Sequence, residues 1–343
     1  MAAELKIAFY DTKSYDREYF ARIAQSEPFA ETKFIFDFFD DHLNKATVAL
    51  AKGHDVVCAF VNDLITKEIA DALYDEDIRL IALRSAGYNN VDLKATQGKI
   101  TVVRVPAYSP HAVAEHAVAL LQTLNRKIHK AYLRTRDANF SLKNLVGSEI
   151  YGKTVGIIGT GRIGKVAAEI FKGYGANLLL NDAYPDKTFA MQLNAKYVNL
   201  EELFQQSDYI SLHVPLTTQT RYLINQQCIS MMKKNVMIVN TGRGALIDTK
   251  ALLDALISGR IRGAALDVYE EEEAYFFEDW SAEPIQDANL ARLIQLPNVL
   301  LTAHQAFLTD TALEQIALVT LNNIIDVLEK GKSENEVSWS NRG

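Results

Sequence analysis

The sequence predicts an α/β protein built from two doubly wound parallel sheets, each at the centre of its own domain. Short apolar runs alternate with helical patterns between residues 5 and 105, and the same alternation recurs after residue 154. The chain has 343 residues, more than one domain of ordinary size, so two domains are expected. A glycine-rich turn between a strand and a helix opens the second alternation.

The first alternation has five candidate strands: Lys6–Tyr10, Phe34–Phe38, Val56–Ala59, Leu80–Leu83 and Val102–Arg104. The small-residue turn of residues 84–90 follows the fourth strand, where open α/β sheets bind ligands. An ordinary strand-to-helix loop explains this turn equally well.

A long helix is predicted from Ser109 to about Arg134, because Ser suits the N-cap and Pro110 suits the first helical position. Such a helix is long enough to join two domains. It carries His111, Glu115 and His116, but their spacing matches neither of the helical zinc motifs with two histidines and a glutamate. We therefore expect no metal site.

The organising feature is Gly159-Thr160-Gly161-Arg162-Ile163-Gly164, preceded by the strand pattern of Thr154–Ile158 and followed by a helix pattern from Lys165 to Tyr174. Gly159 permits a tight turn, Gly161 lets the backbone approach a pyrophosphate, and Gly164 allows close helix–strand packing. The N–H groups that open a helix bind phosphates well. This context predicts a dinucleotide site.

The next strand, 177–181, ends at Asp182, about 20 residues past the glycines. A carboxylate there accepts hydrogen bonds from the adenosine ribose and repels a 2′-phosphate. NAD is therefore expected rather than NADP.

Four further buried strands follow, and the residues that end them are capable of chemistry. The strands are Tyr209–Leu212, Val236–Asn240, Ala264–Asp267 and Val299–Thr302, with a helix at 249–258. They lead into His213-Val214-Pro215, Thr241-Gly242-Arg243-Gly244, Asp267 and His304. Because the C-terminal ends of parallel strands share one edge, these residues are expected to face one ligand.

Two of these residues suit the reduction of a 2-keto acid. The planar fork of Arg243 can pair with a carboxylate, and His304 can exchange a proton near neutral pH. A neighbouring carboxylate would favour the protonated ring. The run from Glu270 to Glu273 offers four candidates, and spacing alone does not choose between them.

The C-terminal part is less regular. The acidic and aromatic segment 270–287 is interpreted as a lid or an interface loop. Residues 309–330 have the pattern of an amphipathic helix, and the polar tail 331–343 is expected to be poorly ordered.

Composition excludes several classes of protein. The net charge of −7 argues against non-specific nucleic-acid binding, and we expect no nucleic-acid partner. Cys58 and Cys228 lie far apart and suggest neither a disulfide framework nor a zinc site, which fits a cytoplasmic protein. We expect no signal peptide, and no membrane span because no apolar stretch approaches 18 residues.

Four motifs together resemble the D-isomer-specific 2-hydroxyacid dehydrogenases over nearly the whole chain. They are residues 155–164, 240–244, 267–272 and 302–309. The resemblance implies Arg243 as the substrate clamp, Glu272 as the partner of His304, and His304 as the proton donor. The implied substrate contacts are the backbone of Ala86 and Gly87 together with Tyr108 and Phe307. The implied cofactor contacts are Gly159, Gly161, Arg162, Ile163, Gly164, Asp182, Val214, Pro215, Thr220, Thr241, Gly242 and Asp267.

The resemblance also implies two Rossmann-like, flavodoxin-like domains with a cleft between them. Residues 1–108 and 308–343 would form a discontinuous substrate domain, and residues 109–307 the NAD-binding Rossmann domain. Members of the family form homodimers or larger homo-oligomers such as homotetramers.

The implied activity is NAD-dependent reduction of a 2-keto acid to a D-2-hydroxy acid. The resemblance is nearest to the fermentative members that interconvert pyruvate and D-lactate. The bulk of Tyr108 and Phe307, and the aromatic residues Tyr275, Phe276, Phe277 and Trp280, favour this small substrate. The alternatives are a larger keto acid, of the hydroxyisocaproate or phenyllactate type, and an NAD-sensing corepressor-like binding protein.

Overall fold

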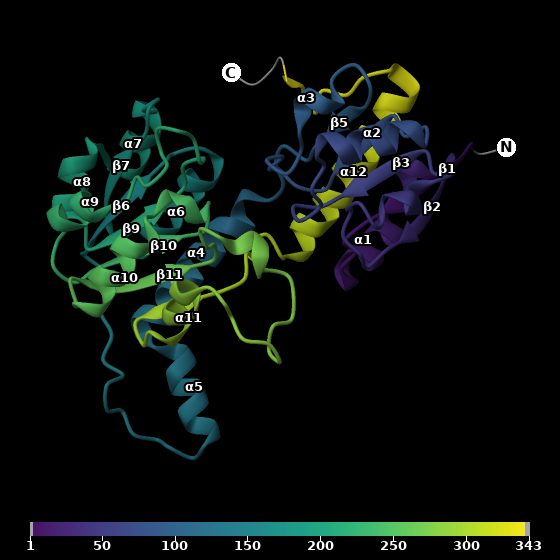
Figure 1. The fold of residues 1–343 in the computed structure, drawn as a ribbon. Coiled ribbons are helices and arrows are strands. Elements are labelled where there is room, and N and C mark those ends of the chain that lie inside the picture. The colour runs from purple at the N-terminus through teal and green to yellow at the C-terminus, as the bar shows by residue number, and fades with distance from the viewer. Residues whose placement is uncertain (1–2, 340–343) are drawn as a thin grey trace. The chain divides into compact units, whose positions relative to one another are not determined.

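The structure, a computed structural model, describes residues 3–339 and divides the chain into two compact units. The terminal unit combines the residues up to Ser109 with those from Leu308 onward, and the central unit comprises Pro110–Phe307. Each unit has one sheet whose strands pair in parallel, with helices on both faces (Figure 1). The prediction of two doubly wound α/β domains is therefore confirmed.

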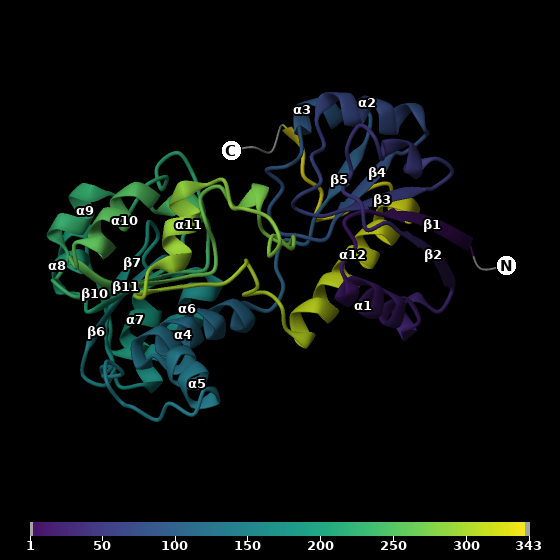
Figure 2. The same cartoon turned by 60° about the horizontal axis from the view of Figure 1, so that its bottom comes forward.

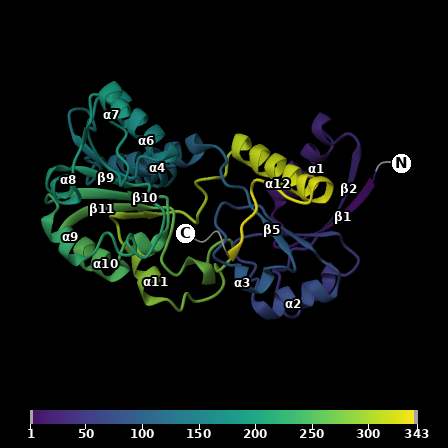
Figure 3. The same cartoon turned by 90° about the horizontal axis from the view of Figure 1, so that it is seen from above.

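The terminal unit has a five-stranded sheet in the order β2-β1-β3-β4-β5. The strands are β1 (Ala3–Phe9), β2 (Thr32–Phe38), β3 (Val56–Ala59), β4 (Leu80–Leu83) and β5 (Thr101–Val103). The helices are α1 (Ser14–Ala24), α2 (Lys67–Asp75), α3 (Leu93–Thr96) and α12 (Asp310–Lys330), with 3₁₀ turns at Glu27–Phe29 and Val48–Ala51. Helices α1 and α12 cover one face of the sheet, and α2 and α3 cover the other (Figure 3).

The central unit has a seven-stranded sheet in the order β12-β11-β10-β9-β6-β7-β8. The strands are β6 (Thr154–Ile158), β7 (Asn177–Asn181), β8 (Lys196–Tyr197), β9 (Tyr209–Leu212), β10 (Val236–Asn240), β11 (Ile261–Leu266) and β12 (Val299–Leu301). The helices are α4 (Pro110–Arg126), α5 (Ile128–Arg136), α6 (Arg162–Gly173), α7 (Lys187–Leu193), α8 (Leu200–Gln206), α9 (Gln226–Met231), α10 (Thr249–Ile257) and α11 (Ala288–Gln295), with 3₁₀ turns at Gly244–Leu246 and Glu272–Ala274.

Two hydrophobic cores lie on the two faces of this second sheet. Helices α4, α6 and α7 pack on one face, and α8 to α11 pack on the other (Figure 2). Successive residues of a strand point to opposite faces, so Tyr209 belongs to the first core and Ile210 to the second. Strands buried on both faces read as continuous apolar runs, which is why the sequence located β9 and β10 without error.

The prediction of one long helix from 109 to 134 is wrong. Helix α4 ends at Arg126 and α5 begins at Ile128, because Lys127 adopts a left-handed conformation with φ 55°. A residue with positive φ cannot continue a right-handed helix. Helix α5 contains no buried residue, so no core-facing apolar stripe continues beyond the break.

The C-terminal segment is more ordered than the sequence predicted. Glu336 pairs with Val103 in an isolated antiparallel bridge, and the side chains of Ser333 and Asn335 donate to Asn323 on α12. The expectation of disorder for residues 340–343 falls outside the described residues. Among the described helices, α12 alone has the length and apolar character of a membrane span. It packs against α1 and β4, and buries Leu313, Ile316, Leu321 and Ile324, as a core helix does.

Candidate active site

The glycine-rich turn joins β6 to α6, and two of its glycines sit in places too tight for a side chain. Gly159 has φ 91°, and a Cβ there would lie 2.7 Å from the backbone of His213. A Cβ on Gly164 would lie 1.9 Å from the carbonyl oxygen of Gly159. Strand and helix therefore approach each other as closely as a dinucleotide fold requires.

Gly161 is different, because a Cβ built on it meets no described atom within 4 Å. It is the N-cap of α6, and no described side chain caps that helix. The first N–H groups of α6 are therefore not capped by a described side chain, and the helix dipole adds positive charge there. These residues fit the pyrophosphate of a dinucleotide.

Asp182 ends β7 and is held in place from two sides. Its Oδ2 accepts hydrogen bonds from Thr160 N at 2.6 Å and Thr160 Oγ1 at 3.1 Å, and its Oδ1 accepts one from Tyr184 N at 2.8 Å. Burial raises the pKa of Asp182, but these hydrogen bonds outweigh it and leave the pKa below its ordinary value. The residue is a fixed negative charge at the end of β7.

Sequence reasoning missed two neighbours of this carboxylate. Tyr197 of β8 contacts Thr160 through its hydroxyl at 2.7 Å, and Lys165 of α6 pairs with Asp186 at 2.6 Å. Strand β8 has only two residues, too few for a recognisable pattern.

The strands β9, β10, β11 and β12 lie side by side in parallel, so the residues that follow them lie along one edge of the sheet. After β9, His213 contacts Ser211 Oγ through Nε2 at 2.7 Å, and burial lowers the pKa of His213 to about 4. Val214 and Pro215 continue that loop, and Thr220 Oγ1 donates to the carbonyl of Pro215 at 2.6 Å. After β10, the buried Oγ1 of Thr241 has no hydrogen-bond partner among the described residues.

Arg243 sits in a turn whose shape Asn240 fixes. The Asn240 side chain accepts from Gly242 N at 3.0 Å and donates to the carbonyl of Arg243 at 2.9 Å. Gly244 is pressed against the next loop, since a Cβ there would lie 2.0 Å from the backbone of Tyr269. The guanidinium of Arg243 donates to the carbonyl of Gly242 at 2.7 Å and pairs with no carboxylate in the described part of the chain.

His304 and Glu272 form the pair that the resemblance implied. Nδ1 of His304 lies 2.7 Å from Oε1 of Glu272, and Oε2 of Glu272 accepts from Tyr269 N at 2.8 Å. The ring of Phe277 lies 6.1 Å from the imidazole, centre to centre. Glu270 is engaged elsewhere, with Tyr222 and with Thr249 Oγ1.

Asp267 holds the loop that carries His304. It is fully buried, and its carboxylate accepts from Thr302 Oγ1 at 2.5 Å, Gln305 N at 3.0 Å and Ala306 N at 2.8 Å. His304 N donates to the carbonyl of Asp267 at 2.7 Å, and His304 has φ 50°, which is uncommon for a residue with a side chain. These contacts make Asp267 an anchor of the loop, and its expected contact with the cofactor stays a prediction.

His116 of α4 also belongs to this arrangement, which the sequence did not predict. Its Nε2 lies 3.3 Å from Asp267 Oδ1 and 3.3 Å from Thr302 Oγ1. Burial raises the pKa of Asp267, but the hydrogen bonds from His116, Thr302 and the backbone bring it below its ordinary value.

Segment 270–287 is only partly a surface loop. Phe276 is buried in the core of the central unit, and the Tyr269 hydroxyl donates to Asp287 at 2.6 Å. Trp280 remains exposed and contacts Tyr275. Phe307 is buried at the end of the unit.

In the terminal unit, residues 84–90 follow β4 as predicted. Arg84 is fully buried between the rings of Phe9 and Phe60, and its Nη2 donates to the carbonyl of Asp11 at 2.5 Å. The carbonyl of Ala86 accepts from Arg104 at 2.7 Å, and that of Gly87 accepts from Ser85 Oγ at 2.8 Å. The N–H groups of Ala86 and Gly87 donate to no group in residues 3–339. Tyr108 follows β5 in the same unit.

Comparisons with known proteins agree with this geometry. The family model of the D-isomer specific 2-hydroxyacid dehydrogenase NAD binding domain matches residues 118–306. The chain is 51% identical to a 2-hydroxyacid dehydrogenase homolog of Haemophilus influenzae, over 96% of this chain and 97% of that protein. It is 48% identical to the D-lactate dehydrogenase of Escherichia coli, over 96% and 98%. The apo structure of D-lactate dehydrogenase from Escherichia coli superposes with a TM-score of 0.88 at 46% identity, covering 97% of this chain and 100% of that one.

The central unit is Rossmann-like, with an open dinucleotide turn and a histidine–glutamate pair at its strand ends. Together these features define an NAD-dependent oxidoreductase. The chain belongs to the D-isomer specific 2-hydroxyacid dehydrogenase family, and its cofactor is NAD.

Proposed function

We propose that this protein is an NAD-dependent D-lactate dehydrogenase, which reduces pyruvate to D-lactate reversibly and serves fermentation in the cytoplasm. The observation that carries the proposal is the hydrogen bond between His304 and Glu272, because it supplies an oriented acid–base group next to the strand-end turn of Arg243. The similarity to the Escherichia coli D-lactate dehydrogenase supports the choice of substrate. Two free thiols fit a cytoplasmic location.

Arg243 binds the carboxylate of the keto acid. Its guanidinium has no acidic partner among the described side chains, so it is available for a bidentate pair with a ligand. We assign the free N–H groups of Ala86 and Gly87 to the same substrate, with Tyr108 and Phe307 beside it. The terminal unit would then serve the substrate and the central unit the cofactor.

His304 gives its proton to the keto oxygen. Since Nδ1 faces Glu272, Nε2 is the nitrogen that can face the substrate, and the carboxylate stabilises the ring while it is protonated. NAD, when bound in its reduced form, would supply the hydride for this reduction. Asp267 positions the reaction by fixing the loop of His304 through two backbone N–H groups.

The remaining cofactor contacts follow the sheet edge. The first turn of α6, with Arg162 and Ile163 behind Gly161, would hold the pyrophosphate, and Asp182 would hold the ribose. Val214, Pro215 and Thr220 would flank the adenosine. Thr241 and Gly242 would lie near the nicotinamide, and the unpartnered Oγ1 of Thr241 supports a polar ligand there.

The substrate is tested by the rate of NADH oxidation with pyruvate, 2-ketoisocaproate and phenylpyruvate, followed by chiral analysis of the product. We expect pyruvate to give the highest kcat/KM and the product to be D-lactate. The bulk of Tyr108 and Phe307 would disfavour larger acids, and one methylene in an apolar pocket changes the discrimination by about 1–3 kcal/mol. A preference for the branched or aromatic acid would contradict the substrate, and absence of turnover with all three would contradict the enzyme.

We also propose that the protein is a homo-oligomer, joined through α5 and the loop after it. Large apolar side chains there are more than half exposed, among them Ile128, Tyr132, Leu133, Phe140, Leu142 and Val146. Apolar surface of this kind in one segment is typical of an interface between copies. Sedimentation should show a dimer or tetramer that Phe140→Asp with Leu142→Asp converts to monomers, and a monomeric unaltered protein would contradict the proposal.

A further inference from the structure

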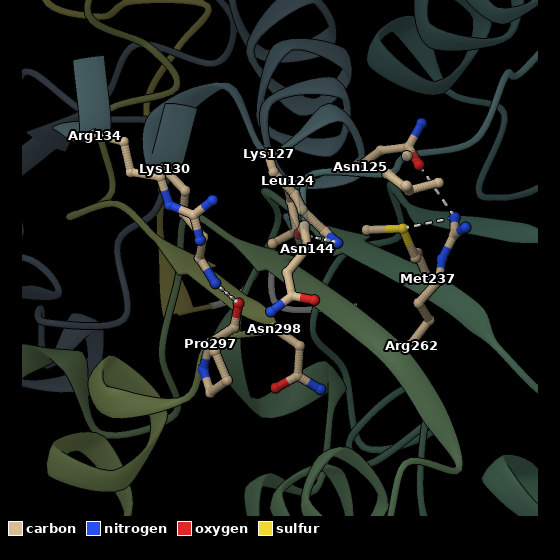
Figure 4. Close-up of a pocket in the computed structure, with 12 residues that line it drawn as sticks. Leu124, Asn125, Lys127, Lys130, Arg134, Asn144, Met237, Arg262, Pro297 and Asn298 are labelled. Carbon is tan, nitrogen blue, oxygen red and sulfur yellow. Dashed lines mark hydrogen bonds between the residues drawn. The ribbon is translucent and has the colours of Figure 1, made fainter. Parts of the chain in front are cut away.

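A pocket of about 420 Å³ lies in the central unit, away from the strand ends that carry His304 and Arg243. Its floor is formed where strands begin: by Met237 of β10, Arg262 of β11 and Asn298 before β12. Its walls are the end of α4, helix α5 and residues 144–147 (Figure 4). This is the opposite edge of the sheet from the candidate active site.

Four cations line the pocket: Lys127, Lys130, Arg134 and Arg262. Figure 4 shows Arg134 and Lys130 on one side, Arg262 on the other, and Asn144 between them. The lining residues include no aspartate and no glutamate. Within residues 3–339, none of the four cations forms an ion pair with a carboxylate.

The four cations instead donate to uncharged groups. Lys127 bonds to the carbonyl of Asn144 at 2.9 Å, Lys130 to that of Pro297, and Arg134 to that of Lys143 at 2.7 Å. Arg262 reaches Ser148 Oγ at 2.5 Å, while its buried Nε has no partner among the described groups. Carbonyl dipoles compensate a positive charge only in part, so the pocket keeps an excess of positive charge. Burial, with the charges of Lys127 and Arg134, lowers the pKa of Lys130.

The walls of the pocket are fixed without a ligand. The side chain of Asn125, which is buried, donates to the carbonyl of Ser148 at 2.7 Å and accepts from Ser148 N at 3.2 Å. Gly147 lies against the end of α4, where a Cβ would come 2.5 Å from the carbonyl oxygen of Asn125. A preformed site loses little conformational freedom when a ligand binds.

We propose that this pocket binds a small polyanion, such as a phosphate ester or another metabolite with two or more adjacent negative groups. Its volume falls within the range of small-molecule sites. Arginine pairs with phosphate through two parallel hydrogen bonds, and lysine adds a point charge. Lys127, Lys130 and Arg134 lie within two turns at the start of α5, whereas Ile128 and Tyr132 lie on another side of this helix.

The test is thermal unfolding of the full protein, titrated with inorganic pyrophosphate at constant ionic strength. Saturating NAD⁺ is present throughout, so that pyrophosphate does not occupy the cofactor turn. We expect Tm to rise and saturate, as it does for a ligand that binds only the folded state. Inorganic phosphate and a tricarboxylate, titrated separately, distinguish a phosphate ligand from a carboxylate ligand.

The decisive comparison is between two variants. Lys130→Gln with Arg134→Gln should weaken pyrophosphate binding roughly tenfold or more, since each charged hydrogen bond contributes about 1.5–3 kcal/mol. Arg136→Gln removes a charge from the same helix outside the pocket and should bind as the unaltered protein does. Equal Tm shifts in all three proteins would show a general salt effect and overturn the proposal. No shift in any of them, or a change in oligomeric state as the only effect of the double variant, would overturn it too.

Discussion

Nδ1 of His304 lies 2.7 Å from Oε1 of Glu272, while Oε2 of the same carboxylate is held by the N–H of Tyr269. Each oxygen of Glu272 thus has one partner, and the carboxylate cannot turn away from the ring without losing a backbone hydrogen bond. The backbone that carries the imidazole is held by Asp267, which accepts hydrogen bonds from the N–H groups of His304, Gln305 and Ala306. The contacts therefore fix both the ring and its proton-bearing nitrogen.

Glu272→Gln tests this relationship. The amide keeps the shape of the carboxylate but no longer stabilises a protonated ring, so the alkaline fall of reductive kcat/KM should move to lower pH. At neutral pH the rate should fall on the order of 10-fold to 100-fold. The pH profile is measured with pyruvate and NADH, and Glu273→Gln in the same segment is the control. An unmoved profile would show that Glu272 does not act on His304.

Arg243→Lys tests the carboxylate clamp. Lysine keeps the charge but loses the planar fork, so we expect kcat/KM for pyruvate to fall about 10-fold to 100-fold, the effect of about 1.5–3 kcal/mol for a charged hydrogen bond. Steady-state kinetics measure it. The control is Arg292→Lys on the exposed side of α11, which should leave kcat/KM for pyruvate unchanged. If both variants behave as the unaltered enzyme, Arg243 does not bind the substrate.

Asp182→Ser tests cofactor choice. The pKa of Asp182 is lowered, so the side chain is charged at neutral pH and repels a 2′-phosphate. The unaltered enzyme should use NADH far better than NADPH. In the variant, the ratio of kcat/KM with NADH to kcat/KM with NADPH should be roughly tenfold smaller. Asp248→Ser is the matched control, because serine retains the N-cap of α10 while a charge is removed away from Asp182. Equal use of both cofactors by the unaltered enzyme would refute the role of Asp182.

His213 gives the protein a pH-dependent stability. Burial lowers its pKa from 6.5 to about 4, so between these values the unfolded chain binds a proton that the folded chain does not. The stabilisation is complete above pH 6.5 and is lost as pH falls toward 4. Between pH 7 and pH 4 the free energy of unfolding should fall less in His213→Gln than in the unaltered protein, by on the order of 2 kcal/mol. Denaturant unfolding measures this. The exposed His111→Gln should keep the original slope, and an identical slope in both variants would contradict the prediction.

Several features required the tertiary structure. The four glutamates of residues 270–273 are equivalent in local pattern, and only the resemblance to a known family pointed to Glu272. The structure supplies the physical reason, because the 3₁₀ turn after β11 places Glu272 against His304, 32 positions later. The anchoring of the His304 loop by Asp267 and His116 joins three elements that no local pattern connects. The break at Lys127 also escaped prediction, because the backbone turns there at a single residue.

The sequence by itself determined the two parallel sheets, the dinucleotide turn and the strand ends where chemistry is found. Short stretches of sequence determine these features. Buried strands need continuous apolar runs, and Gly159 and Gly164 occupy positions that admit no side chain. Only the tertiary structure decided which charges meet. It paired Glu272 with His304, and it gathered Lys127, Lys130, Arg134 and Arg262 around one pocket without a carboxylate. The physical reason is that an electrostatic interaction depends on distances in space, and residues far apart in the chain acquire those distances only when the sheets and helices pack.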